Sequence, residues 1–121
     1  MSGKQKFTDG IKDLGYEVED KGDNRIAFYY VFTEGRFKDK KIKIGFEIPP
    51  DFEVTPPSGP HISPRLLPIN PNALSHNERA HESPNFGTEW EYLSRPFPNW
   101  PKTKRTVKEY MRYIKHLLDT L

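Results

Sequence analysis

The sequence predicts an α+β fold in which a small antiparallel sheet is covered on one face by helices. Three observations predict this fold: a stretch that alternates strictly between apolar and polar residues, a stretch rich in β-branched and aromatic residues, and an apolar stripe at helical spacing. These features occupy residues 41–48, 25–32 and 103–121. Because 121 residues suit one compact domain with a core of its own, we expect a single domain over residues 1–121.

The N-terminal part predicts a short helix followed by an extended segment. In residues 4–15, apolar side chains recur at spacings of four and three, as on one face of a helix. They are Phe7, Ile11 and Leu14. Gly15 is suited to end this helix. The stretch "YEVED" then begins an extended segment, and "KGDN" at 21–24 is typical of a turn.

Two stretches predict the central strands of the sheet. "RIAFYYVF" at 25–32 has the β-branched and aromatic residues that favour strands. "KIKIGFEI" at 41–48 alternates, so that its apolar residues share one face and its charged residues the other. The apolar residues are Ile42, Ile44, Phe46 and Ile48. This pattern indicates an antiparallel strand that is buried on one side.

The stretch "TKRTVKEYMRYIKHLLDTL" at 103–121 predicts the second helix. Its apolar residues recur every three or four positions and form one stripe, while lysines and arginines occupy the other face. The stripe consists of Val107, Tyr110, Met111, Ile114, Leu117, Leu118 and Leu121. Either Thr103 or Thr106 is suited to cap its N-terminus.

A proline-rich segment separates the strands from this helix. All 12 prolines lie in the range from Pro49 to Pro101. We expect this segment to be extended and irregular, with its shape fixed by rigid φ angles rather than by strand ladders. Trp90 and Trp100, the only tryptophans, fall in its last part, "SPNFGTEWEYLSRPFPNW". We expect both rings to be buried and to anchor the segment to the sheet and to the last helix.

The composition excludes several classes of function. The absence of cysteine excludes disulfides, thiolate catalysis and cysteine-based zinc sites. A formal charge of +2 with interspersed signs argues against a nucleic-acid partner. His76 and His81 lie five apart and so do not share a helix face, and we expect neither a metal site nor a cofactor. Without a stretch of roughly 20 apolar residues or an apolar signal core, we expect a cytoplasmic protein that has no membrane partner.

Three short motifs, in this order of elements, resemble the ubiquitin-conjugating enzyme (UBC-like) superfamily. They are "FEIPPDFEVTPP" at 46–57, a Pro-Asn step at 71–72 or 84–85, and Trp100-Pro101 before the last helix. The run "WEYLSRPFPNW" is similar to a bacterial branch found beside ubiquitin-like proteins. The chain departs from the superfamily in lacking the catalytic cysteine and a strict His-Pro-Asn motif. The resemblance implies a cysteine-less component of a conjugation pathway, with a ubiquitin-like protein and its activating enzyme as partners.

The resemblance leaves two registers for the position of the missing cysteine. Counting from Asn72 reaches Ala80, and counting from Asn85 reaches Leu93, next to Ser94. In the second register, Ser94 would carry the C-terminus of the ubiquitin-like protein as an oxyester. In the first register, Ala80 is inert, and the chain would bind its partner without a covalent step.

The catalytic interpretation assigns roles to residues near Ser94. A serine hydroxyl needs a nearby base, and His81 and His76 are the candidates. The amide of Asn85 would donate to the tetrahedral oxyanion, as the motif asparagine does in the superfamily. The alternatives are an ordinary loop in which Ser94 bonds to the backbone, a scaffold that only binds, and an unrelated α+β binding domain.

Four further residues are candidates for binding. Arg95 is suited to bind a carboxylate or the acidic surface of a partner. Trp90 and Trp100 would hold the binding loop in place. His61 is either a core histidine bonded to the backbone or a binding residue.

Overall fold

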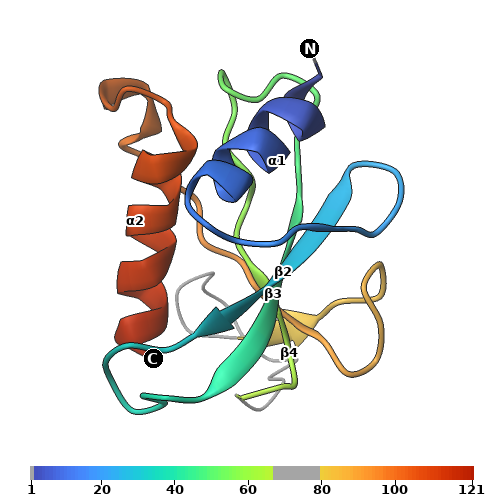
Figure 1. Cartoon of the computed structure of the whole chain (residues 1–121), viewed down its shortest axis with the longest axis vertical. Helices are drawn as coiled ribbons and strands as arrows, with labels where there is room; N and C mark the ends of the chain where they lie inside the picture. The colour runs from blue at the N-terminus through green and yellow to red at the C-terminus, as the bar shows by residue number, and fades with distance from the viewer. Residues whose placement is uncertain (1, 67–79) are drawn as a thin grey trace.

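The computed structural model describes residues 2–66 and 80–121, with the side chain of Ala80 left out, and shows the predicted α+β class (Figure 1). The described residues form two α-helices, one short 3-10 helix and an open six-stranded antiparallel sheet with strand order β1-β2-β3-β4-β6-β5. The helices are α1 (Gly3–Asp13), η1 (Trp100–Lys102) and α2 (Val107–Asp119). The strands are β1 (Glu19–Asp20), β2 (Arg25–Val31), β3 (Lys41–Glu47), β4 (His61–Ser63), β5 (Ala80–Glu82) and β6 (Glu91–Leu93).

Helix α1 forms where the apolar spacing predicts it. Ser2 caps its N-terminus by accepting a hydrogen bond from the backbone N–H of Gln5 at 3.1 Å. Phe7 and Ile11 are completely buried, whereas Leu14, which follows the last helical residue, is 39% exposed. The helix therefore buries two of the three residues that predicted it.

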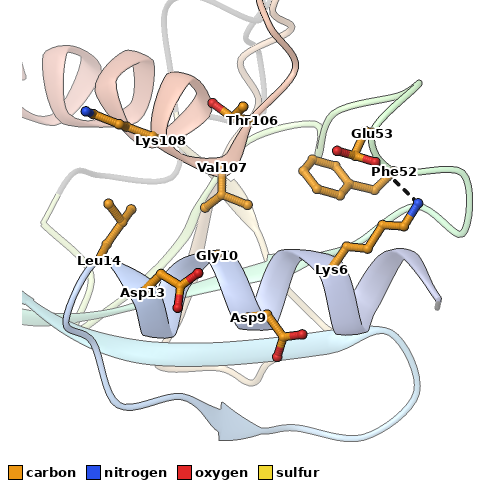
Figure 2. A pocket seen from close by; sticks show the side chains of 10 residues that line it. All are labelled: Lys6, Asp9, Gly10, Asp13, Leu14, Phe52, Glu53, Thr106, Val107 and Lys108. Atoms are coloured by element: carbon orange, nitrogen blue, oxygen red, sulfur yellow. Dashed lines mark hydrogen bonds and ion pairs between the residues drawn. The ribbon is translucent and has the colours of Figure 1, made fainter.

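A close approach between α1 and α2 requires a glycine. A Cβ atom on Gly10 would lie 2.4 Å from Cγ2 of Val107, the first residue of α2. Figure 2 shows these two residues facing each other at a hollow of about 460 Å3 between the helices. Its rim carries both signs of charge, with an ion pair of 3.3 Å between Lys6 and Glu53.

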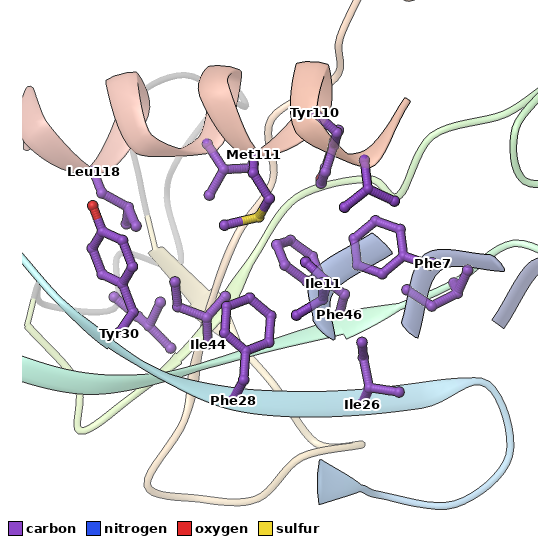
Figure 3. Packing of buried hydrophobic residues seen from close by; sticks show 14 of the residues in the cluster. Phe7, Ile11, Ile26, Phe28, Tyr30, Ile44, Phe46, Tyr110, Met111 and Leu118 are labelled. Atoms are coloured by element: carbon purple, nitrogen blue, oxygen red, sulfur yellow. The ribbon is translucent and has the colours of Figure 1, made fainter. Parts of the chain in front are cut away.

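Strands β2 and β3 pair over seven residues each and confirm the two predicted strands. Their register places Phe28 opposite Ile44 and Ile26 opposite Phe46, so apolar side chains from both strands share one face. Figure 3 shows these side chains meeting residues of α1 and α2. The rings of Phe46 and Tyr110 lie 5.5 Å apart, edge to face. The core therefore lies between the sheet and both helices.

Of the two threonines predicted to cap α2, the structure uses Thr106. Its hydroxyl accepts a hydrogen bond from the backbone N–H of Glu109 at 3.2 Å. Thr103 lies three residues before Thr106, and its hydroxyl donates instead to the carbonyl oxygen of Trp100 at 2.8 Å. The hydrogen bond of Thr103 therefore caps the end of η1, and the helix α2 begins separately after Thr106.

The meander predicted before the proline-rich segment is confirmed by β1, β2 and β3, which pair in sequence order, but the prediction that the proline-rich segment lacks ladders is wrong. The segment contributes β4, β5 and β6, and β6 pairs between β4 and β5. Each of these strands is a triplet without proline, so its backbone N–H groups remain available for pairing. The prolines of this segment lie outside these three strands and do not prevent them from forming.

Within the described residues, neither α-helix combines the length and the apolar composition needed to cross a bilayer.

Candidate functional site

Residues 83–90 fold over the face of the sheet that points away from the helices. Gly45, His61 and Tyr92 are lateral neighbours in adjacent strands, and Gly45 alternates with the core residues Ile44 and Phe46. The Phe86 ring occupies the space above Gly45, where a Cβ atom would come within 2.4 Å of it. This glycine therefore allows the aromatic segment to lie against the sheet.

His61 is held between two aromatic rings on this face. Its ring lies 4.4 Å from the Phe86 ring and 4.5 Å from the Tyr92 ring, at interplanar angles of 30° and 23°. His61 is 7% exposed, and its Nδ1 lies 2.6 Å from the hydroxyl oxygen of Ser83. His61 is thus a buried histidine, but its partner is a serine hydroxyl rather than the backbone.

The His61 ring lies in the wall of a cavity of about 270 Å3, here called the His61 cavity. Its lining also includes Glu47, Ser58, Ser83, Asn85 and Tyr92. The amide nitrogen of Asn85 donates to a Glu47 carboxylate oxygen at 2.9 Å. The phenol of Tyr92 donates to the hydroxyl of Ser58 at 2.7 Å. Polar groups from four separate segments therefore converge here.

Ser94 lies in a different hollow, here called the Ser94 groove, with a volume of about 350 Å3. Its walls are formed by residues 55–58 and 96–98, which include four prolines and Phe97. Ser94 itself is 8% exposed. Ser58 lines both the groove and the His61 cavity, so the two hollows adjoin.

The structure therefore does not bring the predicted catalytic residues into one hollow. Asn85 lines the His61 cavity and donates to Glu47, whereas Ser94 lines the neighbouring groove. His81 lies in β5 opposite Tyr92, with ring centres 6.1 Å apart. Asn72 and His76 fall outside the described residues, as does the side chain of Ala80, so the alternative register stays a prediction.

Arg95 borders the Ser94 groove on the side of α2. Its backbone N–H donates to the carbonyl of Ser58 and its guanidinium donates to the carbonyl of Ser94, both at 2.8 Å. Burial lowers the pKa of Arg95, and the nearby Tyr113 opposes that effect. A hollow of about 330 Å3 lined by Arg95, Tyr113 and His116 adjoins it. Arg95 thus lies between the Ser94 groove, through its bond to Ser58, and the residues of α2 that line the neighbouring hollow.

Both tryptophans are buried, as predicted. Trp100 is 1% exposed and its indole N–H donates to the carbonyl of Glu53 at 2.8 Å. Trp90 is 8% exposed and lies against Phe86, with ring centres 5.0 Å apart. Trp100 therefore offers no ring surface to a partner, and it anchors Glu53, two residues before the wall of the Ser94 groove formed by residues 55–58.

Ser83 is the residue of this region that sequence reasoning missed. It is separated from His61 by 22 residues, and no periodic pattern links the two positions. The only local signal is its place directly before Pro84-Asn85, the Pro-Asn step that the resemblance singled out.

The buried histidine makes stability depend on pH. Burial lowers the pKa of His61 from 6.5 to about 4; Arg25 adds to this effect, while Glu47 opposes it. Below pH 6.5 the unfolded chain binds a proton that the folded protein does not, so the free energy of unfolding falls as the pH falls towards 4. The expected loss over this window is about 3 kcal/mol.

Urea denaturation at about pH 7 and about pH 4 measures this loss. The exposed carboxylates also titrate in this range, so the comparison is made with His61→Gln, which retains them. The variant should lose about 3 kcal/mol less between the two pH values than the unaltered protein. Equal losses in both proteins would show that His61 is not buried in its neutral form.

Among residues 2–66 and 80–121, no three His, Asp or Glu side chains are grouped so that they could hold a metal ion. No protein-family model matches this chain, and the searches of curated proteins and of solved structures found no similar protein.

Proposed function

We propose that this chain is a UBC-like, cysteine-less component of a ubiquitin-like protein conjugation pathway. In this proposal it holds the extended tail of the ubiquitin-like protein in the Ser94 groove. The α+β architecture supports the proposal. So does the position of Pro84-Asn85, which line the cavity that adjoins this groove through Ser58.

The observation that carries the proposal is the construction of the Ser94 groove. Four of its wall residues are prolines, whose φ angles are fixed, so the walls are already rigid before a partner arrives. A preformed site lowers the entropic cost of binding. Proline also lacks a backbone N–H, so these walls suit contact with apolar parts of a tail more than the addition of a strand. Trp100 and Arg95 hold the two walls in place through backbone carbonyls.

The geometry favours binding over covalent transfer at Ser94. An oxyester on Ser94 needs a donor for the tetrahedral oxyanion. The predicted donor, Asn85, faces the neighbouring cavity and donates to Glu47. The covalent carrier is the second candidate, and it is favoured by one observation, namely that Ser94 itself lines the groove.

The test uses a purified bacterial ubiquitin-like protein and its activating enzyme. Binding is measured by calorimetry, first with the ubiquitin-like protein alone and then with activating enzyme and ATP. Pro98→Arg places a long cation at an exposed position of the groove and should weaken binding about tenfold or more. Val31→Arg, at an exposed position of β2 outside the groove, is the matched control and should bind normally.

The same mixture distinguishes the two candidates. If the tail is only bound, Ser94→Ala retains binding and no covalent adduct forms with ATP. If the chain is a carrier, an adduct forms that hydroxylamine cleaves and that Ser94→Ala abolishes. Absence of binding by the unaltered protein, or equal binding by Pro98→Arg, would contradict the proposed function.

A further inference from the structure

We propose that Ser83 and His61 form a serine–histidine pair that accepts the acyl group of a small activated ester or thioester in the His61 cavity. This site lies beside the Ser94 groove, and the proposal does not depend on what that groove binds.

The first support is the geometry of nucleophile and base. The Ser83 hydroxyl lies 2.6 Å from Nδ1 of His61, within the range needed for direct proton transfer. Both partners are fixed. The Ser83 carbonyl accepts the backbone N–H groups of Phe86 and Gly87 at 3.1 and 2.9 Å, and the imidazole lies between Phe86 and Tyr92. The pair is therefore held in one arrangement.

The second support is the protonation state of the histidine. Burial lowers the pKa of His61 to about 4, so the imidazole is neutral at neutral pH. When the Ser83 hydroxyl donates to Nδ1, the proton of the neutral ring is on Nε2. The lone pair of Nδ1 then faces the hydroxyl proton at a distance of 2.6 Å between the heavy atoms.

The third support is the rest of the cavity. Ser83 is 3% exposed, and it lines both the His61 cavity and a second hollow of about 280 Å3 next to it. One N–H of the Asn85 amide donates to Glu47, and the other N–H of the same amide is the candidate donor to an oxyanion. The volume suits a short acyl chain. Glu47 and Glu82 in the lining disfavour a negatively charged one.

The reaction follows from these positions. The Ser83 oxygen attacks the carbonyl carbon of the ester while its proton passes to Nδ1 of His61. The negative charge that develops on the carbonyl oxygen lies within the cavity that Asn85 lines. Collapse breaks the bond to the leaving oxygen or sulfur, which takes the proton from His61. The product is an ester of Ser83, and water can release the acid by the same proton path.

The first experiment uses an alkyl fluorophosphonate, whose phosphorus reacts with activated serines and loses fluoride. The intact mass of the labelled protein should show a single adduct, and mass spectrometry of its peptides should place that adduct on Ser83. Ser83→Ala should abolish the adduct, and His61→Gln should slow labelling about tenfold or more. Ser63→Ala removes a serine from the same strand as His61 that does not line the cavity, and it should label normally. Labelling at another serine, or at an unchanged rate in His61→Gln, would overturn the proposal.

A second experiment does not require Ser83→Ala to fold. Because the chain contains no cysteine, Ser83→Cys introduces a single thiol. Iodoacetamide should alkylate it about tenfold or more faster at neutral pH than the thiol of the matched variant Ser63→Cys. Adding His61→Gln should remove this advantage. A slow reaction that is insensitive to His61→Gln would show that the position is closed or not activated, and would overturn the proposal.

Discussion

Replacing Trp100 by alanine is expected to destabilise the protein by about 3–5 kcal/mol, the range for removing a large buried aromatic side chain. The ring is 1% exposed and packs against Phe52, Phe97 and Tyr110, with ring centres 5.7–6.1 Å apart. The substitution also removes the hydrogen bond to the carbonyl of Glu53. Urea denaturation followed by far-UV circular dichroism measures the loss.

Trp100→Phe is the matched control, because it keeps an aromatic ring and loses the indole N–H. It should cost about 1–2 kcal/mol, from the lost hydrogen bond and the smaller ring. If Trp100→Ala cost no more than Trp100→Phe, the ring would not anchor residues 53–58 as the structure indicates. Because residues 55–58 of this segment form one wall of the Ser94 groove, Trp100→Ala should also weaken any binding in that groove.

Replacing Gly59 by alanine is expected to cost about 4 kcal/mol, close to the upper end for a single substitution. Gly59 has a φ of +143°, and a Cβ atom there would lie 2.1 Å from the carbonyl oxygen of Leu93 and 2.8 Å from the backbone nitrogen of Arg95. Both are backbone atoms and cannot turn aside. Hydrogen bonds from Leu93 to Pro60 and from Arg95 to Ser58, at 2.9 and 2.8 Å, hold the two segments at this separation.

Gly22→Ala separates backbone strain from the steric clash. Gly22 also has a positive φ, +90°, but nothing lies within 4 Å of the position its Cβ would take. Its substitution should therefore cost only the strain of the left-handed conformation, about 1–2 kcal/mol. Equal losses for Gly22→Ala and Gly59→Ala in urea denaturation would mean that residues 58–60 are not held against residues 93–95.

Local patterns in the sequence predicted the parts of the fold that are long enough to show a period. Residues 41–48 alternate over a whole strand, and residues 103–121 repeat over several helical turns, so both elements were found with boundaries close to those observed. Strands β4, β5 and β6 have three residues each, which is too short to show a period. Their order in the sheet depends on contacts between distant segments, which no local pattern contains.

The candidate site was predicted only in part, for a related reason. His61 and Asn85 were named from their residue types, and the structure places both in the lining of one cavity. Ser94 was joined to Asn85 by counting along the chain in one of the two registers that the resemblance allows. Residues 83–87 turn over the outer face of the sheet, with Gly87 at a φ of +138°. Ser94 therefore lines the neighbouring groove and not the cavity that Asn85 lines. Proximity along the chain was a poor guide here because this turn lies between the two residues.

The position of Phe86 above Gly45 has a consequence for the order of assembly during folding. Strands β2 and β3 are adjacent in sequence, so their hairpin closes a short loop and we expect it to form early. Residues 83–90 can dock only on a sheet that already contains β3 and β4, because their contacts are with Gly45 and His61. We therefore expect the bond between Ser83 and His61 to form late in folding. A nascent or partly unfolded chain carries both side chains but not the pair, so any reactivity that depends on the pair is confined to molecules that have finished folding.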